Sequence, residues 1–99
     1  MPKVFYRGES YIAKYDMRTS DREKTLMKGT MNFVGYFISI GNTTSEAELK
    51  VSQVSTDVAP FLYAYTLGNK QPLIDAIQNC NLEHMTQEAK DFLINELTN

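Results

Sequence analysis

Cysteine and histidine are almost absent from this sequence of 99 residues, which contains one of each. Because a single cysteine, Cys80, cannot form a disulfide within the chain, the sequence excludes a secreted disulfide scaffold and indicates a reducing, cytoplasmic setting. The first 17 residues carry five charged side chains, and no later run approaches the length of a membrane span. We therefore expect neither a signal peptide nor a transmembrane segment.

The residues that ordinary catalysis requires are also scarce. His84 follows Cys80 by four positions, a spacing that on a helix can present two zinc ligands, but no second pair of ligands accompanies them. No Asn or Asp in a recognisable context orients the same two residues as a nucleophile and its base. The turn at 41–46 has one glycine and no following lysine, which favours helix capping over phosphate binding. We expect a protein that is not an enzyme and that holds no metal and no cofactor.

Charge is distributed unevenly along what the length predicts to be a single domain, residues 1–99. Residues 1–30 contain seven Lys or Arg against four Asp or Glu, a balance of +3, and residues 31–99 contain three against eight, a balance of −5. The basic end is therefore N-terminal. Its charge density is low for a nucleic-acid-binding arm and is typical of a solvated surface.

The residue pattern before position 42 is typical of strands. Aromatic and β-branched residues alternate over 3–6 and 11–17, which predicts a hairpin, and the polar stretch 18–24 predicts a loop. The run "MNFVGYFISI", residues 31–40, is apolar on both faces and predicts a central strand with a bulge at Gly35. A second copy of the chain would cover the second apolar face of that strand, so a homo-oligomer is a further alternative.

After position 42 the period becomes helical. Ser45 and Glu48 match a capping box, and a seam follows at helical spacing, consisting of Ala47, Val51, Val54, Val58, Phe61 and Tyr65. A fourth strand over 47–54 is the alternative, because that stretch is rich in strand-forming residues. Pro60 either bends one continuous helix or lies in the first turn of a second helix that is capped by Asp57.

Two further helices are predicted toward the C-terminus. Gly68 ends the helix before it as a left-handed cap, and the next helix starts at Asn69 with Pro72 in its first turn. The last helix begins at the Thr86 cap. The predicted fold is therefore α+β: a small antiparallel sheet of three, or four, strands, followed by three or four helices that pack on one face.

Residues 60–79 resemble the helix-turn-helix pattern. Ala64 takes the small position of the first helix, Gly68 lies at the turn, and Ile74 and Ile77 take the packing positions of the second helix. The resemblance implies a DNA-reading second helix, yet its outward positions, Gln71, Asp75 and Asn79, include no Lys or Arg. A nucleic-acid-binding regulator that uses this segment or the N-terminal hairpin is the alternative function.

The leading prediction is a small non-enzymatic regulatory protein that binds a protein partner. Tyrosine and arginine are favoured at protein interfaces, and both types are interleaved in the predicted hairpin, on the basic side of the sheet. Tyr63 points away from the helical seam, beside Gly68. The predicted partner-binding residues are Phe5, Tyr6, Arg7, Tyr11, Lys14, Tyr15, Arg18 and Tyr63.

Overall fold

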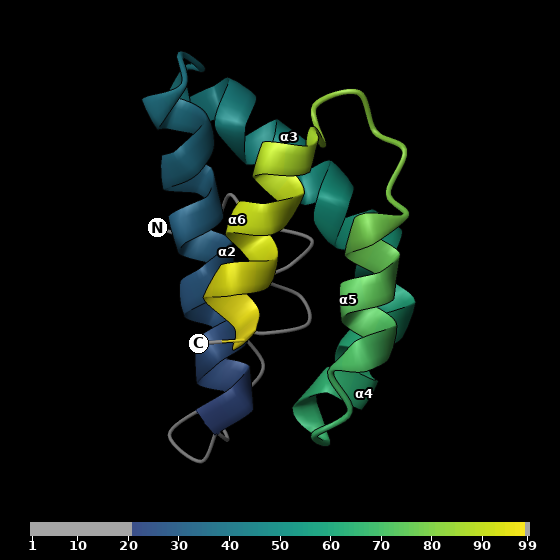
Figure 1. Ribbon diagram of the computed structural model, residues 1–99. Coiled ribbons are helices and arrows are strands. Elements are labelled where there is room, and N and C mark those ends of the chain that lie inside the picture. Colours follow the sequence, from purple (N-terminus) through teal and green to yellow (C-terminus); the bar gives the residue numbers. More distant parts are fainter. Residues whose placement is uncertain (1–20, 99) are drawn as a thin grey trace.

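The computed structural model describes residues 21–98, whose regular structure is helical, with no strand among them (Figure 1). The elements are α2 (Asp21–Ser39), α3 (Thr44–Val58), the 3₁₀ helix η2 (Ala59–Phe61), α4 (Leu62–Thr66), α5 (Gln71–Gln78) and α6 (Gln87–Thr98). In Figure 1, α2 and α6 lie side by side and run in opposite directions, while α3 also packs on α2. α5 contacts α3, α4 and α6 and closes the other side of the bundle.

The α+β prediction is wrong, because the predicted central strand over 31–40 lies almost entirely in α2. Phe33 and Phe37 are four residues apart and therefore share one helical face, where each is 1% exposed. Alternation and helical spacing both fit so evenly apolar a run, and the sequence alone favoured the wrong period. Positions 21–24 of the predicted loop form the start of the same helix. The predicted hairpin over 3–17 lies outside the described residues.

The chain leaves α2 through a glycine turn and enters α3 at a cap. Gly41 has φ +112, and the amides of Gly41 and Asn42 donate to the carbonyls of Ile38 and Phe37, which is a Schellman motif. Thr43 then forms a capping box with Glu46, at 3.1 Å and 2.8 Å. The predicted box at Ser45 and Glu48 is therefore two residues too late, and the alternative strand over 47–54 is wrong because this stretch is helical.

Pro60 breaks the helix and shifts its buried face by one residue. The first four positions of the predicted seam are buried in α3, but Phe61 is 37% exposed and Leu62 is 7% exposed in its place. Phe61 follows Val58 by three positions and Leu62 follows it by four, so both fit helical spacing, and the break at η2 decides that Leu62 faces the core. Tyr65 returns to the core at 1% exposed.

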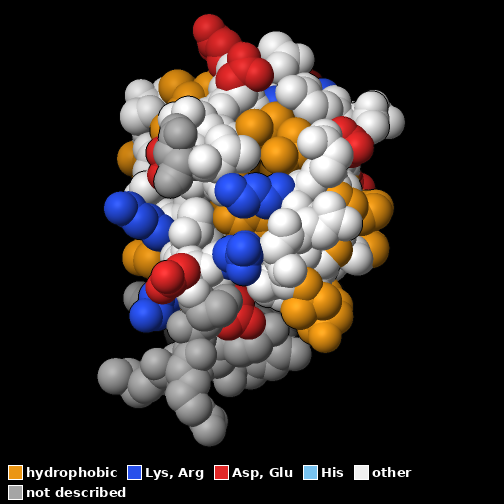
Figure 2. Space-filling view, turned by 60° about the horizontal axis from the view of Figure 1, so that its bottom comes forward, with side chains coloured by type: hydrophobic (Ala, Val, Ile, Leu, Met, Phe, Trp, Pro, Cys, Tyr) orange, Lys and Arg blue, Asp and Glu red, His pale blue; other side chains and the backbone are white. Residues whose placement is uncertain are grey.

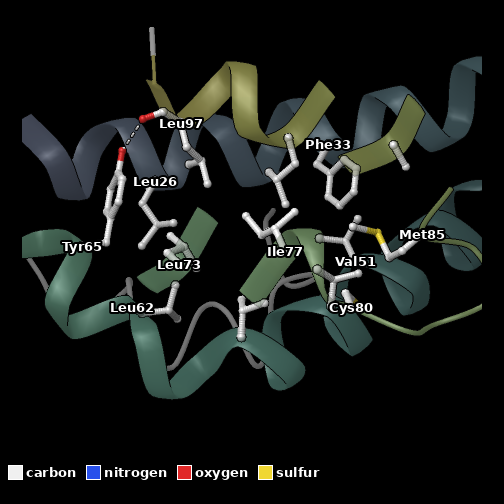
Figure 3. Close-up of a cluster of buried hydrophobic side chains, with 14 of the residues drawn as sticks. Leu26, Phe33, Val51, Leu62, Tyr65, Leu73, Ile77, Cys80, Met85 and Leu97 are labelled. Carbon is white, nitrogen blue, oxygen red and sulfur yellow. Dashed lines mark hydrogen bonds between the residues drawn. The ribbon is translucent and has the colours of Figure 1, made fainter. Parts of the chain in front are cut away.

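The core lies between α2, α3, α5 and α6 (Figure 3). Leu73 and Ile77 of α5 point into it, and ring stacking of Tyr36 on Phe92, with centroids 4.9 Å apart, joins α2 to α6 at its edge. The Thr30 hydroxyl is buried and donates to the Leu26 carbonyl at 2.8 Å. Within residues 21–98, no buried side-chain nitrogen or oxygen lacks a hydrogen-bond partner. The buried polar side-chain atoms of this part of the chain are therefore all hydrogen-bonded, as is usual in a well-packed core.

Candidate protein-binding surface at the Gly68 corner

The turn between α4 and α5 is built around Gly68. This residue has φ +102, and its amide donates to the Tyr65 carbonyl at 3.0 Å while the Asn69 amide donates to the Ala64 carbonyl at 2.9 Å. Those two bonds are the Schellman pattern, which needs a residue that accepts the left-handed conformation. The predicted glycine cap is confirmed, and it gives the end of α4 a defined shape.

Two large apolar side chains project from α4 into solvent. Tyr63 is 69% exposed and Leu67, at the end of the same helix, is 67% exposed, the two highest values among the large hydrophobic residues that the structure describes. They are four residues apart and therefore lie on the same side of the helix. On the opposite side, the buried Tyr65 hydroxyl donates to the Leu97 carbonyl at 2.8 Å (Figure 3). α4 is thus anchored from behind and presents an apolar pair in front.

Two cations lie at the Gly68 turn, which directly follows this apolar pair in the chain. A Cβ added at Gly68 would be 3.3 Å from both Cζ and Nη2 of Arg22, so the guanidinium of α2 rests against the corner. Arg22 and Lys70 line one depression of about 160 Å³, together with Asp21 and Tyr65. Figure 2 shows Lys and Arg side chains in the middle of this end of the molecule, with hydrophobic side chains beside them. We call Arg22, Tyr63, Leu67, Gly68 and Lys70 the corner surface.

The environment of Tyr65 shows how the two sides of α4 differ. Burial raises the pKa of the Tyr65 phenol above its ordinary value, and the nearby charge of Arg22 opposes that shift. Its hydroxyl is therefore a protonated donor at neutral pH. Tyr65 acts as an anchor and is not available for binding, whereas Tyr63 is.

The predicted binding residues divide into two groups. Tyr63 is exposed as predicted, although its role in binding stays a prediction. The others lie outside the described residues; they are Phe5, Tyr6, Arg7, Tyr11, Lys14, Tyr15 and Arg18. The sequence analysis missed Arg22, Leu67 and Lys70. Leu67 could have been found from its four-residue spacing to Tyr63, but Arg22 is 46 positions before Gly68 and carries no local signal of that contact.

Cys80 and His84 face different neighbours. Cys80 is 3% exposed, and burial raises the pKa of its thiol, with Asp57 adding to the shift. The His84 Nε2 lies 3.0 Å from the Lys50 carbonyl, and burial lowers the pKa of the imidazole. No cluster of three or more metal-ligating side chains occurs among the residues that the structure describes.

The segment that resembles a helix-turn-helix is a pair of short helices. α4 has five residues and α5 has eight. Gln71 at the start of α5 donates to the Asp75 carboxylate at 2.7 Å, so two of the outward positions of this helix are paired with each other. α5 itself contains no Lys or Arg to contact a phosphate backbone.

Two other surfaces expose apolar side chains. Along α2, Met27, Met31 and Ile38 are 38%, 54% and 41% exposed. Along α3, Leu49 is 60% exposed at a shallow groove that also includes Pro60. The apolar residues of both sets are less exposed than the Tyr63 and Leu67 pair. The corner surface is therefore the strongest candidate.

Comparison with protein-family models, curated proteins and solved structures gives no match to this chain. Among residues 21–98, even the longest helix, α2, lacks the run of apolar residues that a bilayer requires, and so does every other helix there.

Proposed function

We propose that this chain is a cytoplasmic, non-enzymatic binding protein that contacts another protein through the corner surface. The observation that carries the proposal is the exposure of Tyr63 and Leu67, side by side on a helix that is anchored from behind. Tyrosine is enriched among the residues that dominate interface energies, and arginine is as well. The single thiol, Cys80, is buried and free, which suits a reducing compartment.

The rigidity of the corner supports this role. The Schellman turn and the bond from Tyr65 to Leu97 fix the direction of α4 before any partner arrives. Binding therefore costs little backbone ordering, and the main entropic loss falls on the exposed side chains. Tyrosine loses little conformational freedom for the area that it contributes.

The proposal is tested by recovery of partners from a lysate of the source cells. We expect the double variant Tyr63→Ser with Leu67→Ser to lose the proteins that the wild type recovers, because both apolar contacts are removed. The matched control is Leu49→Ser, which removes a similarly exposed side chain on α3. Equal recovery by wild type and double variant, with far-UV circular dichroism showing both folded, contradicts the proposal.

A second variant set tests the predicted N-terminal residues. Arg7→Ala, Tyr11→Ala and Lys14→Ala, combined in one chain, should weaken recovery of the same partner if these residues extend the contact. Unchanged recovery would confine the function to the corner surface.

A further inference from the structure

We infer that the corner surface binds a protein segment in which an acidic side chain stands next to an apolar one. This inference rests on the proposed function and names the chemistry of its partner. The surface offers two kinds of contact around the Gly68 turn: an apolar pair, Tyr63 and Leu67, which precedes the turn, and a cationic pair, Lys70, which follows it, and Arg22, which reaches it from α2.

Positive charge predominates in the depression at the corner. The Arg22 guanidinium lies against Gly68, where the missing side chain leaves room for it. Arg22 and Lys70 line their depression with one carboxylate, that of Asp21, so cations outnumber anions there by two to one. A planar guanidinium donates two parallel N–H bonds to a carboxylate.

The charge of the surrounding protein makes this corner distinctive. Residues 21–98 contain six Lys or Arg against ten Asp or Glu, a net charge of −4. A long polyanion would be repelled by most of that surface, because nucleic-acid binding depends on many phosphate contacts. A short segment with one or two carboxylates meets only the local positive charge, so the observations favour a peptide over a nucleic acid.

The apolar pair supplies the other half of the recognition. An exposed Lys or Arg with a carboxylate alone contributes little in water. Beside Tyr63 and Leu67, an apolar side chain of the partner excludes water from the ion pair and strengthens it. Specificity therefore requires both features in one segment, the acidic residue over Arg22 and Lys70 and the apolar residue over α4.

The experiment selects binders from a random-peptide library displayed on phage, with the full chain as the target. We expect selected sequences to combine Asp or Glu with Leu, Phe or another large apolar residue. Synthetic copies are then titrated by fluorescence anisotropy. Reversing both charges, Arg22→Glu with Lys70→Glu, should weaken binding at least tenfold, which is about 1.4 kcal/mol.

The matched control is Lys24→Glu with Lys28→Glu. Both residues are exposed on α2, and the pair changes the net charge by the same amount. Lys24 is two positions from Arg22 and so faces another side of the helix. This control should weaken binding less than about threefold, the size expected of a distant surface charge. Equal losses in the two charge variants would overturn the inference.

Three further outcomes are decisive. Failure to select any peptide, or selection of peptides without carboxylates, overturns the inference. Tighter binding of a random single-stranded DNA at the same salt concentration also overturns it. If binding falls with Tyr63→Ser and Leu67→Ser but not with the corner charge reversal, the proposed protein-binding role stands and the acidic partner is wrong. The two proposals therefore fail separately.

Discussion

Replacing Tyr65 with phenylalanine removes one buried hydrogen bond and leaves the ring in place. The Tyr65 hydroxyl donates at 2.8 Å to the Leu97 carbonyl, and Leu97 is 2% exposed. That carbonyl belongs to the last turn of α6, where carbonyls lack partners within the helix. A net hydrogen bond contributes about 0.5–1.5 kcal/mol, and an unsatisfied buried acceptor costs about 1–3 kcal/mol. We expect Tyr65→Phe to lower the free energy of unfolding by about 1.5 kcal/mol.

Urea unfolding of the full chain, followed by far-UV circular dichroism, measures the effect. For a domain of this size the expected loss corresponds to a fall in melting temperature of roughly 6–12 °C. The control is Tyr63→Phe in the same helix, where the ring is 69% exposed, and the change should stay within about 0.5 kcal/mol. The reasoning is refuted if Tyr65→Phe lies within that same margin of wild type or if both variants lose equally.

The alkaline pH dependence gives an independent check on Tyr65. Burial raises the pKa of its phenol, so the unfolded chain releases this proton at lower pH than the folded chain does. The stabilising contribution is therefore complete below about pH 10, the ordinary value for tyrosine, and is lost as the pH rises through the folded pKa. Tyr65→Phe lacks this loss, so the stability difference between wild type and variant should narrow above pH 10. If the stability difference between wild type and Tyr65→Phe stays constant above pH 10, the role given to the buried Tyr65 hydroxyl is contradicted.

Four other substitutions, each at a single position, give further predictions. Gly35→Ala should raise the free energy of unfolding by about 0.5–1 kcal/mol, because Gly35 is exposed in the interior of α2 and no described atom lies within 4 Å of the new Cβ. Gly68→Ala should lower the free energy of unfolding, because φ is +102 at Gly68. Urea unfolding measures both changes, and the same change in the free energy of unfolding for both glycine variants would contradict the prediction. Thr43→Ala should cost about 1 kcal/mol in the same assay through loss of the α3 cap, and an unchanged midpoint would refute the cap. Burial lowers the pKa of the His84 imidazole, so the contribution of this residue to stability is complete above the ordinary pKa of about 6.5 and is lost as the pH falls through the folded pKa. Between about pH 7.5 and 5.5, the free energy of unfolding should therefore fall less steeply in His84→Gln than in wild type. Identical slopes would contradict this prediction.

Local chemistry let the sequence determine several features by itself. The glycine cap at Gly68 is confirmed, because only a residue without Cβ adopts a positive φ there at no steric cost. The cap at Thr86 is confirmed by its bond to the Ala89 amide at 3.2 Å. The break at Pro60 follows from its missing amide hydrogen, and the start of the seam at Ala47 follows from helical spacing. Each of these depends on residues within one or two turns of chain.

Only the tertiary structure decided the rest. Phe33 and Phe37 satisfy either a strand or a helix by pattern, and it is packing against α3 and α6 that favours the helix. The one-residue shift from Phe61 to Leu62 depends on how η2 meets the core. The corner surface requires Arg22 to reach Gly68, and two positions so far apart in sequence meet only when α2, α4 and α6 have packed together. Local propensities carry no information about such contacts, because their energies arise from burial shared among several helices.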